Sequence, residues 1–145
     1  MCTRFHRVAR GLAEREGGRN TFACKNESDL QHLFHALLQL QFDEIRLEEY
    51  TPSYARKTTR MHFHLPDEQL AVVVKKTRKG VGPKKVSAQL TADIAHFEKH
   101  PDCAKLVCFV YDPDGHIKDP RELERDFSSA RGEFGVRVLV TQQGD

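Results

Sequence analysis

Two neighbouring segments of the chain carry side chains that could do chemistry. In residues 60–65 basic and imidazole side chains alternate with apolar ones, and the β-branched run of residues 70–74 ends at Lys75. Every second side chain of a strand points to the same face, so His62 and His64 are expected to share one face. On the next strand Lys75 shares a face with Val73, and we expect the two faces to meet. A lysine there could hold a phosphate group by its charge.

A metal site is one alternative use of the two histidines. Neutral imidazole suits zinc or nickel better than magnesium, and Glu48 or Glu49 in the preceding segment could add a carboxylate ligand to His62 and His64. A His-x-His pair on a strand also occurs without any metal, so a purely structural role is the simpler interpretation.

The spacing of His96, His100 and Cys103 is also compatible with zinc, but no fourth ligand is evident, and a helix surface is the simpler interpretation. The other cysteines, Cys2, Cys24 and Cys108, form no CxxC pair with one another or with Cys103. We interpret the cysteines as core or near-core thiols.

Positive charge gathers directly after the apolar run. The whole chain has a formal net charge of only +2, yet the segment 75–85 holds six basic residues and no acidic one. A local cluster of one sign produces a field that the whole-chain sum hides, and it favours a phosphate-bearing partner. The alternative is a solvated lysine-rich loop. The expected nucleic-acid-binding face comprises Arg60, Lys75, Lys76, Arg78, Lys79, Lys84 and Lys85.

Apolar periodicity predicts the elements that would position these residues. Ser28 with Gln31 is typical of a capping box at the start of the second helix, and Asp119 with Pro120 is typical of the start of a short late helix. The predicted order is a helix in 3–16, a helix from about Ser28, strands at 43–50, 60–65 and 70–74, a helix at 84–99, a strand at 106–111, the short helix, and a strand at 134–140.

This order predicts one α/β domain. A hairpin followed by helical crossovers favours a mixed sheet of about five strands with helices on both faces. Because a glycine pair ends the first helical segment, we divide the chain into an N-terminal helical arm at 1–20 and the main domain at 21–145.

Length and composition are those of a globular domain. Of the 145 residues, 39% are hydrophobic and 30% are charged. A chain of this length can bury one hydrophobic core that needs no disulfide bond or metal ion for stability. No apolar run approaches the roughly 18 residues that a membrane span needs, and the first residues do not form a secretory signal. We therefore expect a cytoplasmic protein without a membrane partner.

Two stretches of the sequence resemble a known family. Residues 51–82, TPSYARKTTRMHFHLPDEQLAVVVKKTRKGVG, and residues 86–115, VSAQLTADIAHFEKHPDCAKLVCFVYDPDG, resemble the DpnII/MboI-like branch of the PD-(D/E)XK nucleases. The resemblance covers most of residues 21–140. It implies a restriction-endonuclease-like fold and a setting in bacterial defence or restriction.

The resemblance also implies where the active site would lie. In the relatives the first hairpin strand carries an aspartate and the second ends in E-x-K; these positions match His62, Val73 and Lys75 here, and a helical glutamine matches Gln89. Both carboxylates are therefore replaced. Phosphodiester hydrolysis in this family depends on Mg²⁺, which prefers oxygen ligands, and Val73 offers no ligand at all.

We therefore expect a pseudo-nuclease that binds nucleic acid, DNA or RNA, and needs no cofactor. One alternative is a divergent metal-dependent endonuclease, with Mg²⁺ or Mn²⁺ required if the site is active, or with His62 and His64 as metal ligands. Another alternative is a protein-interaction or regulatory module, which could include a homodimer.

Overall fold

A computed structural model describes residues 2–14, 22–50 and 60–143. These residues form one six-stranded mixed sheet, with strand order β1-β2-β3-β4-β6-β5. Within it, β2 is antiparallel to both of its neighbours, β1 and β3, whereas β3, β4 and β6 are parallel, and β5 is antiparallel to β6. The elements are η1 (Cys2–Arg4), α1 (Phe5–Ala13), α2 (Glu27–Leu38), β1 (Arg46–Tyr50), β2 (Arg60–Leu65), η2 (Pro66–Glu68), β3 (Leu70–Lys76), α3 (Pro83–Glu98), β4 (Lys105–Asp112), α4 (Pro120–Phe127), β5 (Ser129–Arg131) and β6 (Phe134–Gln142).

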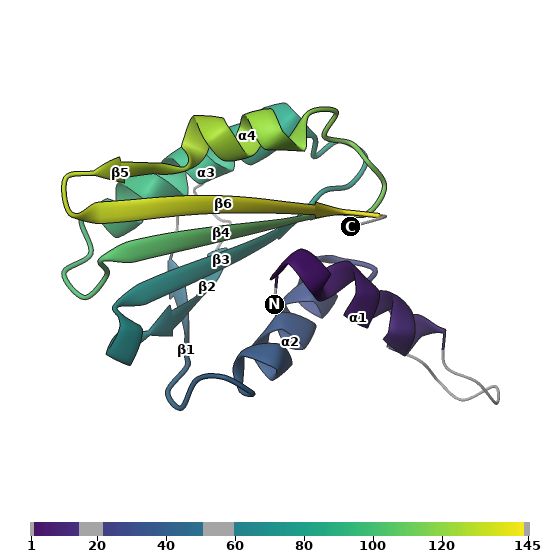
Figure 1. The fold of residues 1–145 in the computed structure, drawn as a ribbon, viewed down its shortest axis with the longest axis horizontal. Coiled ribbons are helices and arrows are strands. Elements are labelled where there is room, and N and C mark those ends of the chain that lie inside the picture. Colours follow the sequence, from purple (N-terminus) through teal and green to yellow (C-terminus); the bar gives the residue numbers. More distant parts are fainter. Residues whose placement is uncertain (1, 15–21, 51–59, 144–145) are drawn as a thin grey trace.

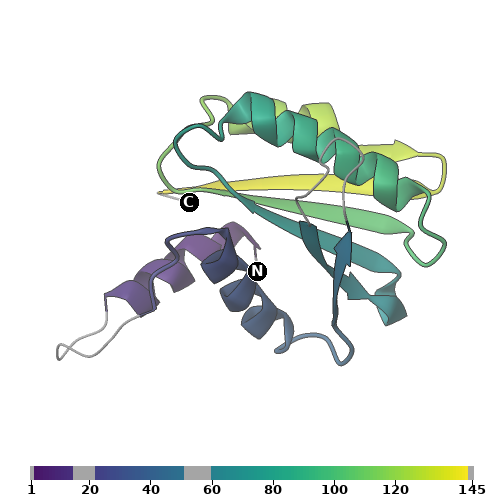
Figure 2. The ribbon, with the colours of Figure 1, turned by 180° about the vertical axis from the view of Figure 1, so that it is seen from behind.

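The helices cover both faces of the sheet, which confirms the predicted fold class. Figures 1 and 2 show α3 and α4 on one face and α1 and α2 on the other. The two parallel crossovers, through α3 and through α4, place these helices on the same side. The sixth strand, β5, was not predicted because it is only three residues long.

Strand alternation divides the core into two layers. On β3, Ala71 and Val73 pack under α3, whereas Val72 and Val74 pack against the α2 side. The parallel strands are thus buried on both faces, as their continuous apolar sequence indicates.

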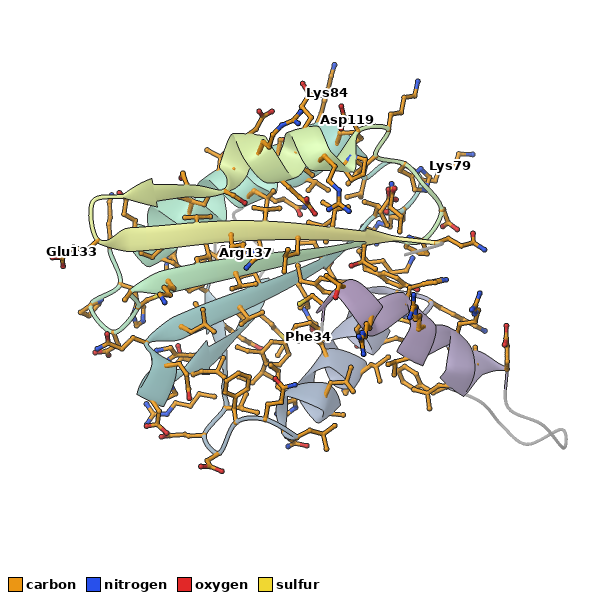
Figure 3. All side chains as sticks on the ribbon, viewed as in Figure 1. Phe34, Lys79, Lys84, Asp119, Glu133 and Arg137 are labelled. Atoms are coloured by element: carbon orange, nitrogen blue, oxygen red, sulfur yellow. The ribbon has the colours of Figure 1, made fainter. Side chains whose placement is uncertain are left out.

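The α1–α2 side is held by a cluster of aromatic rings. Phe5 of α1 is fully buried, and its ring lies 5.2 Å from those of Phe109 and Tyr111. Phe34 of α2 stacks on Phe109 and lies beneath the sheet in Figure 3. The first helix is therefore part of the hydrophobic core.

Two helix starts test the predicted capping residues. The second helix begins at Glu27, and its N-cap is Asn26, whose side chain accepts a hydrogen bond from the Asp29 N–H at 2.8 Å. The Ser28–Gln31 capping box is therefore wrong, because Ser28 already lies inside the first turn. The Asp119 cap of α4 is confirmed, with its side chain accepting from the Glu122 N–H.

The predicted turn after β4 is built around a buried carboxylate. Asp112 accepts hydrogen bonds from the backbone N–H groups of His116 and Ile117 and from side chains of Thr77 and Gln142. These bonds lower the pKa of Asp112 despite its burial. They also tie together the carboxyl ends of the three parallel strands.

Candidate functional site

The hairpin β2–β3 places the predicted site residues under α3. Pairing between the two strands runs from Leu65–Leu70 to Phe63–Val72, so His62 and Val73 come next in this register, where the pairing ends. Both side chains are buried, and both face α3. The two positions that we expect to match the family's carboxylates are thus side by side.

His62 contacts the carboxylate of Glu48 on the neighbouring strand. Glu48 lies opposite His62 in the β1–β2 register, and its carboxylate is 3.2 Å from His62 Nε2 and 3.6 Å from His64 Nδ1. His64 Nε2 also lies 3.2 Å from the carbonyl oxygen of Asp102. Glu49 pairs with Met61 and is exposed, so alternation turns it away from the histidines.

Aromatic rings and burial keep His62 neutral. Its ring meets the Phe97 ring edge-on at 4.6 Å, and only 3% of the residue is exposed. Burial lowers the pKa of His62 to about 4, against the opposing effect of the Glu48 carboxylate. The neighbouring His96 and His64 contribute smaller parts of this lowering.

The three residues near the end of α3 whose spacing is compatible with zinc do not come together as a group. His96 stacks on Tyr50 with ring centroids 4.0 Å apart, whereas His100 faces His64. The thiol of Cys103 donates to the carbonyl of Lys105. The three side chains therefore have separate neighbours, and all four cysteines are free thiols.

Lys75 forms an ion pair that no sequence motif indicated. It is 1% exposed, and its Nζ lies 2.7 Å from Oδ2 of Asp93, a fully buried residue of α3. Burial, and to a smaller extent the Glu27 carboxylate, raises the pKa of Asp93 to about 8. The sequence did hold a signal: Asp93 interrupts the apolar stripe formed by Leu90, Ile94 and Phe97, where a buried carboxylate needs a partner.

The fourth site position, Gln89, lies one helical turn before Asp93. It is half-buried, and its side chain makes no hydrogen bond to any described residue. Gln89 therefore lies on the helix that covers Lys75, but its side chain is not hydrogen-bonded to the Lys75–Asp93 pair.

The donors present do not fit Mg²⁺. That ion requires several oxygen ligands in near-octahedral geometry. Here His62 supplies nitrogen, Val73 supplies nothing, and Asp93 is already beside Lys75. Within residues 2–14, 22–50 and 60–143, no group of three or more His, Cys, Asp or Glu side chains could hold a metal ion. The alternative site of His62, His64, Glu48 and Glu49 is therefore not assembled in this arrangement.

Most of the predicted basic face lies at the end of the molecule where β3 leads into α3. Arg78, Lys79, Lys84 and Lys85 are exposed, and none forms an ion pair with another described residue. Lys79 and Lys84 project outward there, whereas Glu133 lies at the opposite end (Figure 3).

The other three members of that predicted set do not belong to this exposed group. Lys75 does not belong to the exposed surface, because alternation along β3 turns it into the α3 side of the core. The backbone of Arg60 begins β2, but its side chain lies outside the described part of the structure. Lys76 is half-buried on the other face of the sheet.

Comparison with known proteins gives one match. The family model described as REase_DpnII-MboI, for DpnII-MboI restriction endonucleases, matches residues 1–143. No curated protein and no solved structure matches the chain. No helix among the described residues is long and apolar enough to cross a membrane.

The Lys75–Asp93 pair yields a first prediction. Replacing Lys75 by Met removes the ammonium beside a carboxylate that stays buried, which should lower the free energy of unfolding by about 3 kcal/mol. Lys76→Met, which removes the neighbouring half-buried charge, should cost less than about 1 kcal/mol. Urea denaturation measures both. Equal stability of the Lys75→Met protein and the parent would contradict a structural role for the pair.

His62 yields a second prediction. The pKa of His62 is about 4 in the folded chain, against an ordinary value of 6.5. As the pH falls, the imidazole is therefore protonated in the unfolded chain at a higher pH than in the folded chain. Stability contributed by neutral His62 is therefore present above pH 6.5 and is lost as the pH falls toward 4. His62→Phe should reduce this loss by about 2 kcal/mol.

Denaturation at several pH values tests this, with the exposed His32→Phe as the matched control. Asp93, whose raised pKa has the opposite effect, and His96 are retained in every protein compared. Identical pH dependence in the parent and the His62→Phe protein would contradict the prediction.

Proposed function

Since the chain belongs to the DpnII-MboI restriction endonuclease family, we propose that it is a nuclease-fold domain that binds nucleic acid without hydrolysing it. The observation that carries this proposal is how the side chains at the three hairpin positions, 62, 73 and 75, are packed and paired. His62 is engaged by Glu48, Val73 is an apolar core residue, and Lys75 is paired with Asp93.

The chemistry of hydrolysis explains why these positions matter. Cleaving a phosphodiester requires a nucleophilic water and stabilisation of charge on the phosphate, which a carboxylate-bound Mg²⁺ supplies in metal-dependent nucleases. The side chains at this site supply neither the oxygen donors nor an exposed lysine. Burial of Lys75 also prevents it from touching a phosphate in this arrangement.

Binding, by contrast, requires only accessible positive charge. Arg78, Lys79, Lys84 and Lys85 are exposed around the start of α3 and could meet successive backbone phosphates. A guanidinium can hold a phosphate bidentately, whereas each lysine acts as a point charge, so Arg78 is the best positioning contact among them. The family supports a role in restriction or bacterial defence.

The protein-interaction alternative has one supporting observation. Leu47, on the edge strand β1, is 47% exposed and lines a shallow apolar cavity with Met61 and Phe63. An exposed edge strand can pair with another chain. This alternative predicts a stable protein complex and no salt-dependent binding of nucleic acid.

A third prediction concerns the basic surface. Binding of labelled duplex DNA or RNA should weaken steeply with salt, because each neutralised phosphate releases counterions. The double variant Lys79→Ala with Lys84→Ala should lower the slope of log affinity against log salt by up to about two units.

The control removes two exposed charges at the other end of the sheet, as Lys99→Ala with Lys105→Ala, and should leave the slope unchanged. Fluorescence anisotropy at several salt concentrations measures each protein. A flat salt response of the parent, or identical slopes for the parent and the Lys79/Lys84 double variant, would leave the protein-interaction alternative as the better account.

A fourth prediction restores the missing donors. Replacing His62 by Asp and Val73 by Glu places two carboxylates beside Glu48 at the end of the hairpin pairing. Calorimetry should then detect Mn²⁺ or Mg²⁺ binding that the parent lacks. The parent should leave plasmid DNA intact in Mg²⁺.

Two results would count against the proposal. Magnesium-dependent cutting by the parent that disappears in Lys75→Ala would show that the site is active. A folded double variant that binds no metal would show that His62 and Val73 are not the positions of the family's carboxylates.

A further inference from the structure

A small cavity at the carboxyl end of β3 is bordered by positive charge. One wall is formed by residues 76–78, and the other by the residues at which α2 begins. Its volume is about 50 Å³, more than the roughly 10–15 Å³ that a single water molecule needs. The lining residues are Lys25, Asn26, Glu27, Lys76, Thr77 and Arg78.

The charges around the cavity do not cancel. Three cations face one carboxylate, that of Glu27. The side chains of Lys25 and Arg78 form no ion pair with any described residue. Lys76 Nζ makes only a long hydrogen bond, 3.4 Å, to the carbonyl of Thr77. Unneutralised cations converging on a cavity favour an anionic ligand group.

The backbone that carries these cations is fixed. Thr77 donates its N–H to the carbonyl of Tyr111, and its hydroxyl donates to the Asp112 carboxylate. Arg78 exchanges backbone hydrogen bonds with Val81 across a tight turn. On the other wall, Asn26 caps α2. A ligand group would therefore meet cations on an ordered frame, which reduces the entropy cost of binding.

From this arrangement we propose that the cavity is a phosphate subsite, in which Lys25, Lys76 and Arg78 hold one phosphate group of a nucleic-acid strand. The inference rests on the proposed nucleic-acid function and adds Lys25, which lies 50 residues before the basic stretch. Because Lys75 and Lys76 point to opposite faces of β3, the subsite lies on the α2 side, apart from the buried pair. The opening of α2 adds the positive end of its dipole.

The test compares Lys25→Gln and Arg78→Gln with Lys99→Gln, which removes one exposed charge at the far end of α3. Inorganic phosphate is titrated into each protein while backbone amide signals are followed by NMR. Anisotropy then compares short DNA duplexes that carry either a 5′-phosphate or a 5′-hydroxyl, at several salt concentrations.

We expect phosphate to shift the amide signals of Asn26, Thr77 and Arg78 in the parent and in Lys99→Gln, and to shift them far less in the other two variants. Lys25→Gln should weaken duplex binding about 3- to 10-fold at low salt and lower the salt slope by about one unit, whereas Lys99→Gln should stay within about twofold of the parent. A 5′-phosphate preference that Lys25→Gln removes assigns the subsite to strand ends. Equal weakening for both duplexes assigns it to an internal phosphate.

Two results separate failure of the subsite from failure of the function. If Lys25→Gln and Lys99→Gln bind DNA equally, and phosphate leaves the amides unmoved, the subsite is wrong while nucleic-acid binding stands. If phosphate binds through Lys25 but neither DNA nor RNA binds, the nucleic-acid function is wrong, and the cavity belongs to another phosphate-bearing ligand.

Discussion

The ammonium of Lys75 and the carboxylate of Asp93 lie between β3 and α3, where water cannot solvate either of them. Burying either charge alone would carry a large desolvation cost, so each buried group requires the other as its partner. The pair fixes α3 over the hairpin, next to the point where the pairing of β2 with β3 ends. The apolar contacts of Val73 and Phe97 then fill the remaining space.

Alternation along β3 separates two kinds of positive charge. Val73 and Lys75 belong to the α3 side, where the side chains are buried and engaged, whereas Lys76 belongs to the α2 side, near Lys25. One strand therefore carries both one partner of a buried ion pair and one wall of a cationic cavity. A change at the ion pair need not disturb the cavity, because the two lie on opposite faces of the sheet.

Much of the fold could be predicted from the sequence, because strands 60–65 and 70–76 have clear periodicity and the turn residues punctuate the chain. The three hairpin positions, His62, Val73 and Lys75, came from the resemblance to the nuclease family, and strand alternation predicted that Val73 and Lys75 share a face. Burial of Lys75 could not be read from the cluster of basic residues, since a charge count treats Lys75 and Lys76 alike while the pleat sends them to opposite faces.

Other differences arise from competition between similar local signals. Asn26 and Ser28 both suit a helix N-cap, and the choice of Asn26 depends on where the preceding chain leaves the core. The contact between Glu48 and His62 depends on strand register, which the sequence does not specify across residues 51–59. Asp93 is the exception, because its place on an apolar stripe marked it as a residue requiring a partner.

The packing of the first helix has a consequence for how the domain is made. Phe5 contacts Phe109 and Tyr111, and the carbonyl of Cys2 accepts a hydrogen bond from Thr141, 139 residues later. During synthesis α1 leaves the ribosome before β4 and β6, so it can complete its contacts only after both strands have emerged. Until then the apolar side of α1 and the aromatic surface that it covers both remain exposed, so docking of α1 is a step open to aggregation.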